Sequence, residues 1–376
     1  MTINSIRTSH TNFKLHQNYT DEKLFPLIEK YNINVENMPI IGSGAYINLQ
    51  EKIQIIEHLL EAHELALANI KAGNITKRGF ATNICTNDNH WSIGTNFNNT
   101  RNDISSICGE RSAILASYNE ALVRFSKSGS NYFNFKIKYI CMAQSEELSM
   151  IKNSAVPCED CLSWLNTTRY FDDMTTIFSF EKNQKGMLCL KSAKLTDFLP
   201  CKDYELSNNF DFEKPVKYSS SAINSMEKFN LTEEDIMVLV NKNYDLYKEN
   251  TLSNISNQNV VCSVLANGKI YSASKIDWTK RWFTEPLEFA SSKAIENEKE
   301  HCKIAIIAYF GDSCSYNPLT KEKFNDGGIS IKSLGRIRQK YASPDTLLVL
   351  NLEDSLTVLT IGEYLPKKFI QGYKII

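Results

Sequence analysis

The expected helices and strands of this 376-residue chain occur twice in the same order, and this repeat constrains the fold most strongly. The first half contains an expected helix at 48–72, strands at 80–85 and 91–94, a helix at 106–124, a strand at 136–143, a helix at 158–168 and a strand at 175–180. The second half repeats them at 233–247, 260–265, 270–273, 288–298, 304–310, 334–341 and 347–352. Each half then ends on a Leu-Pro pair, and the two align at an offset of roughly 176 to 179 residues throughout, which predicts an internal duplication.

Three cysteines and one glutamate form the passage that points to chemistry. Cys108-Gly109-Glu110 is followed by Pro157-Cys158-Glu-Asp-Cys161, and each cysteine is expected at the start of a helix. Thiolates suit Zn²⁺, and a catalytic zinc uses three protein ligands and keeps a fourth position for water. A structural zinc normally has four ligands, and Cys85 or Cys141 is then a candidate for the fourth. Glu110 argues for catalysis, because a purely structural site does not need it.

These motifs resemble those of the cytidine deaminase family, in its all-cysteine-ligand form. The family pattern reads G-x-N-x-E-N, then C-A-E-R, then P-C-G-x-C-R-Q. This chain has Gly94-Thr-Asn96-Phe-Asn98-Asn99, then Cys108-Gly-Glu110-Arg111, then Pro157-Cys158-Glu-Asp-Cys161. The resemblance implies a three-layer α/β/α cytidine-deaminase-like fold with a mixed five-strand sheet, present twice. It also implies a zinc-dependent hydrolytic deaminase that releases ammonia from a cytosine nucleoside or a close analogue.

The resemblance assigns roles to individual residues. It implies that Zn²⁺ is bound by three thiolates, those of Cys108, Cys158 and Cys161. Glu110 would take the proton of the zinc-bound water, whose hydroxide attacks, and deliver it to the ring nitrogen and then to the departing ammonia. Arg111 would hydrogen-bond the sulfurs and offset the net charge of −1 that three thiolates leave on Zn²⁺. The backbone N–H near Gly109 would orient the carbonyl of the substrate.

The substrate side of the pattern departs from the family. Asn96 is present, but Asn98 stands where the family has the glutamate that holds ribose hydroxyls. Arg78 stands where the family has a phenylalanine that packs on the nucleoside. These changes favour a substrate with phosphate, carboxylate or a modified sugar, because arginine binds such groups in a bidentate manner. A slip of one or two residues in the alignment would instead put Arg78 on a solvated loop.

The duplication predicts four segments and one metal site. Residues 1–47 are an N-terminal extension, 48–204 the catalytic domain, 205–225 a polar linker and 226–376 a degenerate, zinc-less copy. At the stated offset, the three cysteines are replaced by Pro286, Leu334 and Ile337, which cannot bind zinc. The same alignment places Glu288 at the position of Glu110, with no metal to serve.

Three other interpretations remain open. The same zinc and glutamate can act on an amidine or guanidine group of a specialised metabolite, as a deaminase or cyclase of the kind proposed for saxitoxin-like guanidine alkaloids. Deamination of nucleic acid is disfavoured by the formal net charge of −1 and by the lack of an aromatic and basic strip. A non-catalytic zinc scaffold is disfavoured by Glu110.

Composition sets the remaining expectations. Hydrophobic residues make up 42% of the chain and charged residues 23%, as in globular proteins. No apolar stretch approaches the ~20 residues that span a membrane, and no signal-peptide pattern begins the sequence. Ten cysteines are too sparse for a disulfide scaffold, so the seven outside the motif are expected in the core. We therefore expect a cytoplasmic homodimer that acts on a small molecule and binds neither membrane nor nucleic acid.

Overall fold

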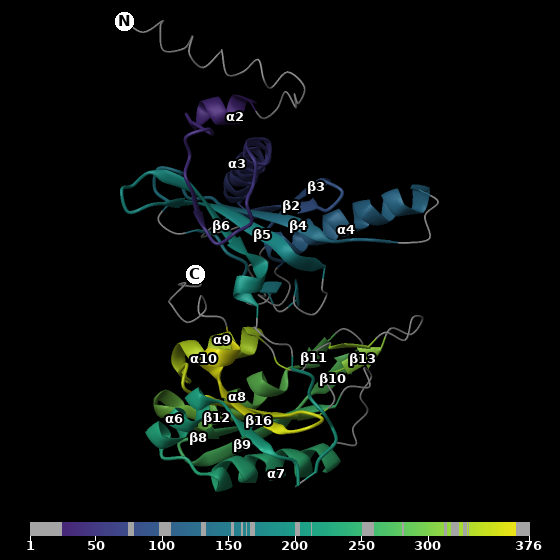
Figure 1. Ribbon diagram of the computed structural model, residues 1–376, viewed down its shortest axis with the longest axis vertical. Helices are drawn as coiled ribbons and strands as arrows, with labels where there is room; N and C mark the ends of the chain where they lie inside the picture. Colours follow the sequence, from purple (N-terminus) through teal and green to yellow (C-terminus); the bar gives the residue numbers. More distant parts are fainter. Residues whose placement is uncertain are drawn as a thin grey trace, which may run out of the picture. The chain divides into compact units, whose positions relative to one another are not determined.

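The computed structural model divides the chain into two compact units. One comprises Met1–Val156 and Met174–Lys194, and the other comprises Pro157–Asp173 and Leu195–Ile376. Each contains one large sheet, drawn in Figure 1. The structure describes residues 25–73, 79–97, 107–128, 133–151, 154–158, 161–162, 164–165, 170–199, 204–211, 213–249, 259–279, 282–311, 314–316, 323–325, 329 and 331–365.

The first sheet has six strands in the order β1-β6-β5-β4-β2-β3. Its strands are β1 (Ile40–Gly42), β2 (Phe80–Thr86), β3 (Trp91–Thr95), β4 (Ile137–Gln144), β5 (Phe171–Lys182) and β6 (Leu188–Lys194). Its helices are α2 (Phe25–Lys30), α3 (Leu49–Lys71) and α4 (Gly109–Ser128). Strand β2 is antiparallel to both β3 and β4, and β1 runs parallel to β6 at the edge. The sheet is therefore mixed.

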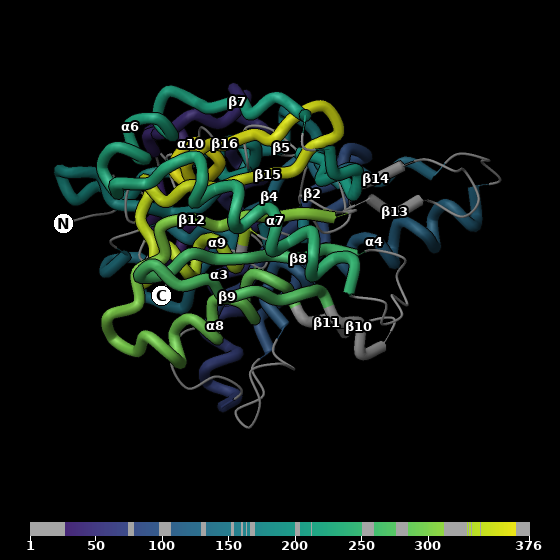
Figure 2. The backbone as a smooth tube through the Cα atoms, turned by 90° about the horizontal axis from the view of Figure 1, so that it is seen from below, coloured from purple at the N-terminus to yellow at the C-terminus, as the bar shows by residue number. Residues whose placement is uncertain are grey.

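The second sheet has the same order, β7-β16-β15-β12-β8-β9, which can be followed in Figure 2. Its strands are β7 (Val216–Tyr218), β8 (Val260–Ala266), β9 (Lys269–Ser274), β12 (Ile304–Gly311), β15 (Leu347–Asn351) and β16 (Leu356–Thr360). Its helices are α6 (Ser220–Phe229), α7 (Glu233–Glu249), α8 (Pro286–Glu298), α9 (Ile331–Lys340) and α10 (Ile361–Tyr364). The remaining short elements are η3 (Leu195–Phe198), η4 (Lys299–His301), β10 (Ile276–Thr279), β11 (Trp282–Thr284), β13 (Cys314–Tyr316) and β14 (Lys323–Asn325).

The shared strand order confirms the predicted α/β class and the duplication. Strand directions agree as well, since β8 is antiparallel to β9 and β12, and β7 is parallel to β16. One side-chain contact is also repeated. Thr175 Oγ1 donates to the Ile137 carbonyl at 2.6 Å, and Thr346 Oγ1 donates to the Ile304 carbonyl at 3.0 Å.

The offset between the two copies is not constant, which corrects the sequence alignment. Strand β2 begins at Phe80 and β8 at Val260, 180 residues later. Strand β4 begins at Ile137 and β12 at Ile304, only 167 residues later. Insertions and deletions in loops cost little free energy, so a fixed offset does not survive around them.

Each sheet has six strands where five were expected. The additional strands are β1 and β7, three residues each, and too short for a periodic signal. Strand β1 lies within the predicted N-terminal extension, and β7 with the start of α6 lies within the predicted linker. Both segments therefore contribute structure to a sheet, while their roles stay predictions.

Helices cover both faces of β2. Ala81 packs with Ala62 and Ala66 of α3 on one face. The next side chain, Thr82, points to the opposite face, because successive side chains of a strand alternate. That face is covered by α4, since a Cβ built on Gly109 would lie 3.4 Å from Thr82 Oγ1. This three-layer arrangement places the start of α4 against the first residues of β2.

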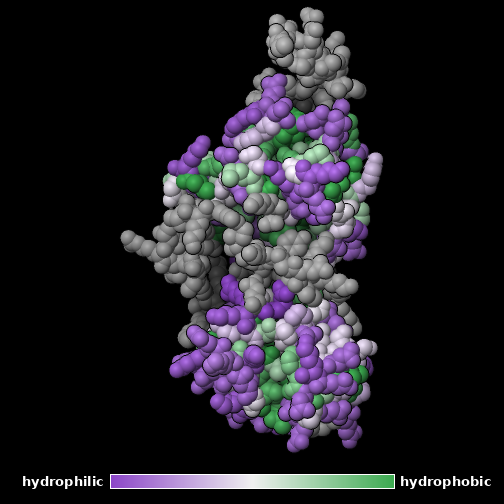
Figure 3. All heavy atoms as spheres, turned by 90° about the vertical axis from the view of Figure 1, so that its left-hand side faces the viewer, coloured by the Kyte–Doolittle hydropathy of each residue, from purple (hydrophilic) through white to green (hydrophobic). Residues whose placement is uncertain are grey.

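The surface is mixed in character. On the face drawn in Figure 3, hydrophilic side chains surround smaller groups of hydrophobic ones. Within the described residues, we find no helix with the length and apolar character needed to cross a membrane.

Candidate metal centre

The first cysteine of the motif caps helix α4. The Ser112 N–H donates to the Cys108 carbonyl at 3.1 Å, which is the first hydrogen bond of the helix. The strand beside α4 makes room for it at Gly94, where a Cβ would lie 2.3 Å from the Ala113 nitrogen. The thiol of Cys108 is therefore held at a helix N-terminus, where unpaired N–H groups favour a negative charge.

The other two cysteines also lie at the start of a helical segment. The Leu162 N–H donates to the Cys158 carbonyl at 2.9 Å, so Cys158 is the capping residue there. Cys161 lies in the first turn and is fully buried, while Cys158 is half-buried. Residues 159–160, 163 and 166–168 of the predicted helix lie outside the described residues.

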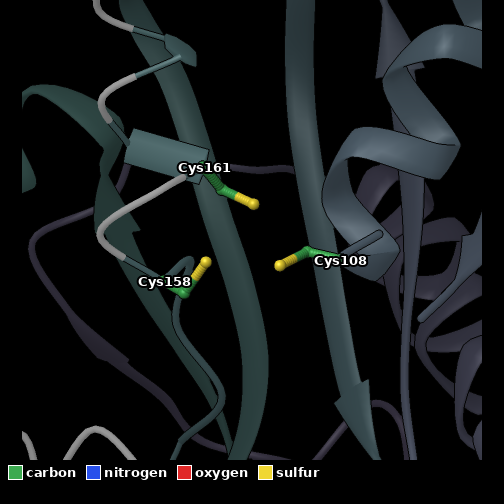
Figure 4. A group of neighbouring side chains, drawn as sticks. All are labelled: Cys108, Cys158 and Cys161. Atoms are coloured by element: carbon green, nitrogen blue, oxygen red, sulfur yellow. The ribbon is translucent and has the colours of Figure 1, made fainter. Parts of the chain in front are cut away.

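The three sulfurs come together, as the sequence spacing predicts. Figure 4 shows the side chains of Cys108, Cys158 and Cys161 pointing toward one another, and their Sγ atoms all lie within 4.8 Å of each other. Two thiolates on a tetrahedral zinc are roughly 3.8 Å apart, given a Zn–S distance of ~2.3 Å. Small side-chain rotations would bring the sulfurs to that spacing, so these residues can hold a metal ion. Among the described residues, no His, Cys, Asp or Glu joins them as a fourth ligand.

Cysteines outside the motif are core residues wherever the structure describes their burial. This group consists of Cys85, Cys141, Cys189, Cys262 and Cys302, all buried and in no disulfide. Burial raises the pKa of the Cys85 thiol to about 12, because a thiolate is poorly solvated there. Neither Cys85 nor Cys141 belongs to the metal cluster. Cys201, and the side chain of Cys314, lie outside the described residues.

Glu110 lies in the first turn of α4, two residues after the first ligand. Its side chain is only 4% exposed, which is unusual for a carboxylate. Arg111 follows it and is half-buried. Glu110 is therefore a buried carboxyl group in the same first helical turn that Cys108 caps.

The predicted substrate-binding residues have different outcomes. Gly109 is buried between the first ligand and Glu110, at the first position of α4. Asn96 follows β3, and its side-chain oxygen accepts from the Phe80 N–H at 2.8 Å, so this atom holds the backbone. Arg78 and Asn98 lie outside the described residues.

The second copy corrects which residues replaced the ligands. Glu285 occupies the capping position of α8, since its carbonyl accepts from the Phe289 N–H at 3.2 Å, as Cys108 does in α4. Ser333, in the first turn of α9, takes the place of Cys161, since it hydrogen-bonds the capping Glu285. Ser330 lies outside the described residues. Leu334 and Ile337, the replacements expected from the sequence, are instead buried core residues further along α9.

Counting from the same helix starts shows that the second copy has no glutamate at the position of Glu110. Leu287, fully buried, takes the place of Glu110, and Glu288 takes that of Arg111. The carboxylate of Glu288 instead accepts from Arg336 on α9 at 3.2 Å. The expectation that Glu288 preserves the shuttle position is therefore wrong, because the true offset between these helix starts is 177 rather than 178 residues.

Sequence reasoning missed Glu285 as the replacement for a ligand. The side chain accepts from the Glu288 N–H at 2.8 Å and contacts the hydroxyl of buried Tyr309 at 3.4 Å. It also accepts a hydrogen bond from Ser333. Burial raises the pKa of Glu285 to about 7 against the effect of these hydrogen bonds. A capping residue directly before Pro286 is the sequence signal that marks this helix start.

Comparisons with known proteins return structural matches alone. No protein-family model matches the chain, and neither does a curated protein. Among solved structures, the cytidine deaminase from Mycobacterium leprae matches with a TM-score of 0.23 at 16% identity, over 36% of this chain and 92% of that one. The cytidine deaminase from Mycobacterium tuberculosis gives 0.23 at 13%, over 37% and 94%. That from Burkholderia pseudomallei gives 0.25 at 16%, over 38% and 98%. TM-scores and identities this low carry no argument about activity.

Proposed function

We propose that this chain is a zinc-dependent hydrolytic deaminase of a cytosine nucleoside or a close analogue. The observation that supports it is the joint placement of three cysteine sulfurs within 4.8 Å and a nearly buried glutamate at the start of one helix. Three sulfur donors without a fourth ligand among the described residues match the donor set of a catalytic zinc. A buried, neighbouring Glu110 supplies the acid–base group that hydrolytic deamination requires.

Different residues of the chain bind the metal, move protons and orient the substrate. Cys108, Cys158 and Cys161 would hold Zn²⁺, which when bound acts as a Lewis acid and lowers the pKa of water. Glu110 accepts the proton lost by the attacking water and passes it to the ring nitrogen. It then takes the remaining proton of that water and gives it to the departing amine, so that the amino group is replaced by oxygen and ammonia leaves. The N–H of Gly109 is one of the unpaired donors of a helix N-terminus and hydrogen-bonds the substrate carbonyl.

The guanidinium group of Arg111 would neutralise part of the negative charge that three thiolates leave on the metal. Arg78 and Asn98 would contact the sugar or an anionic group of the substrate, and Asn96 would align the adjoining strand end. An amidine or guanidine of a specialised metabolite is the alternative substrate for the same residues.

A homodimer is also part of the proposal, and sedimentation of the purified chain measures it.

Ammonia release tests the proposal. Zinc-loaded protein is incubated with cytidine, deoxycytidine, cytidine monophosphate and simple guanidino compounds, and ammonia is measured. We expect release from at least one cytosine compound and a loss of at least ~10³-fold in Glu110→Gln, which keeps the shape of the side chain but cannot move protons. Zinc content should be unchanged in this variant. Full turnover by Glu110→Gln would refute the assigned role, and release only from guanidino compounds would favour the alternative substrate.

A further inference from the structure

Three buried hydroxyl groups have no hydrogen-bond partner among the described residues. They are those of Thr82, Ser117 and Ser291, and each residue is at most 2% exposed. A hydroxyl taken out of water without a partner destabilises the folded state, so native proteins keep few of them. Such a group calls for an explanation, and a ligand is one.

Thr82 differs from the other two by its place. Its Oγ1 lies 3.4 Å from the position that a Cβ on Gly109 would take, at the residue between the first metal ligand and Glu110. Ser117 lies on the same helix but seven residues beyond Glu110, or roughly 10 Å along its axis. The unpartnered hydroxyl of Thr82 therefore lies beside the candidate centre, and that of Ser117 lies far along the helix.

Glycine at position 109 lets the start of α4 lie close to the strand residues that include Thr82. A Cβ there would lie 3.2 Å from the Phe80 carbonyl oxygen and 3.4 Å from Ala81 Cα, tighter than ordinary packing. The hydroxyl of Thr82 and the backbone of Gly109 are therefore near neighbours at this contact. Two donors side by side suit one oxygen acceptor with two lone pairs.

We propose that Thr82 is a substrate-contacting residue whose hydroxyl donates to a carbonyl oxygen next to the reacting amidine. This inference rests on the proposed function and narrows it, because cytosine carries such a carbonyl and a simple guanidine does not. Thr82 and Gly109 together would hold the ring carbonyl while Glu110 protonates the adjacent nitrogen. The free protein bears the cost of the unpartnered hydroxyl, and the bound substrate removes it.

The test separates ligand binding from folding. The dissociation constant of cytidine is measured by calorimetry on zinc-loaded Glu110→Gln protein, with and without Thr82→Val, and the Tm of ligand-free protein is measured for Thr82→Val alone. We expect Thr82→Val to weaken cytidine binding by about tenfold, the value of one neutral hydrogen bond. Its Tm should stay equal or rise by up to about 4 °C, since valine has the same shape and no hydroxyl.

Two further variants serve as controls. Thr82→Ser keeps the hydroxyl and should bind cytidine within about threefold of the parent. Ser117→Ala removes an equally buried hydroxyl and should leave cytidine binding unchanged.

The outcomes that overturn the inference are specific. Unchanged cytidine binding by Thr82→Val would overturn it. So would a clear fall in its ligand-free Tm, because the hydroxyl would then have a partner in the free protein. Cytidine binding by Glu110→Gln without ammonia release by the wild-type protein would contradict the proposed function alone. The ratio of dissociation constants with and without Thr82→Val would still decide the role of Thr82. Absence of cytidine binding by the parent would overturn both.

Discussion

Helices α4 and α8 begin at corresponding places in two copies of one fold, but their capping residues differ: one is a cysteine and the other a glutamate. Cys108 caps α4 and meets Cys158 and Cys161 at a distance suited to a metal ion. Glu285 caps α8, and a hydrogen bond to Ser333 ties it to α9. In each copy, two neighbouring helix starts are in contact through these side chains. The contacting groups are sulfurs in the first copy, and a carboxyl and a hydroxyl in the second.

The replacement has a cost that a metal site does not have. The Glu285 carboxyl is enclosed by α8, by Tyr309 of β12 and by Ser333 of α9, so its charged form is poorly solvated and the pKa of the group rises to about 7. The contact between α8 and α9 in the second copy therefore has a strength that depends on the protonation of Glu285.

The first prediction breaks the comparison by rebuilding the missing site. The triple variant Glu285→Cys, Ser330→Cys, Ser333→Cys should bind one additional zinc per chain, because Glu285 hydrogen-bonds Ser333 and residues 330 and 333 have the sequence spacing of Cys158 and Cys161. It should not gain a second deaminase activity, since Leu287 stands where Glu110 does. Metal analysis of the purified variant provides the measurement.

A matched triple variant tests the fixed-offset alignment instead. Cysteines placed at Pro286, Leu334 and Ile337 should bind no additional zinc and should destabilise the core, where all three side chains are buried. Zinc binding by this variant, with none by the first, would show that the helix-cap correspondence is wrong.

The second prediction concerns the pH dependence of stability. The folded-state pKa of Glu285 lies above the ordinary value of 4.5, at about 7, so the folded protein binds this proton more tightly than the unfolded chain. This contribution to the free energy of unfolding is present below pH 4.5 and is lost as pH rises to about 7. The loss amounts to about 3 kcal/mol.

Glu285→Gln isolates this effect, because glutamine can still accept from the Glu288 N–H but carries no charge. Urea unfolding of both proteins at pH 5 and pH 8 should show a smaller loss of stability in the variant, by about 3 kcal/mol at most. Equal pH dependence in the two proteins would mean that Glu285 titrates normally.

The third and smallest prediction concerns the first residue of each helix. Gly109→Ala adds a Cβ 3.2 Å from the Phe80 carbonyl oxygen and should shift the first turn of α4 by a few tenths of an ångström. Displacement of this size should lower kcat/KM by roughly tenfold, because catalytic groups are sensitive to small misplacement. Zinc content should not change.

Pro286 is the control, since it occupies the same position in the second copy. Pro286→Ala should alter neither zinc content nor turnover. Loss of turnover in that variant, or full turnover in Gly109→Ala, would show that the two helix starts are not distinguished in this way.

The sequence predicted the parts of this molecule that carry a strong local signal. The apolar period of α3 gave its extent to within one residue, and the expected strands at 260–265 and 270–273 match β8 and β9 equally well. The three cysteines were found from the resemblance of their motifs to a known family pattern, and the structure brings their sulfurs together. The correspondence between copies was misjudged by one residue at α8, since a change of loop length leaves no mark in composition.

Other features depend on tertiary contacts and could not be predicted. Strands β1 and β7 are three residues long and are defined only by the strands beside them. Thr82 resembles any polar residue of a strand, and its missing partner becomes visible once α4 covers it. Glu285 is ordinary in sequence, and its enclosure by three separate elements raises its pKa.

Zinc content is the most direct test of the central claim that Cys108, Cys158 and Cys161 form the metal centre. We expect one zinc per wild-type chain, less than about a tenth of that in Cys161→Ser, which leaves two thiolates, and one zinc in the control Cys189→Ser, whose thiol lies in the core. Full zinc content in Cys161→Ser, or its loss in Cys189→Ser, would show that these three cysteines do not form the metal centre.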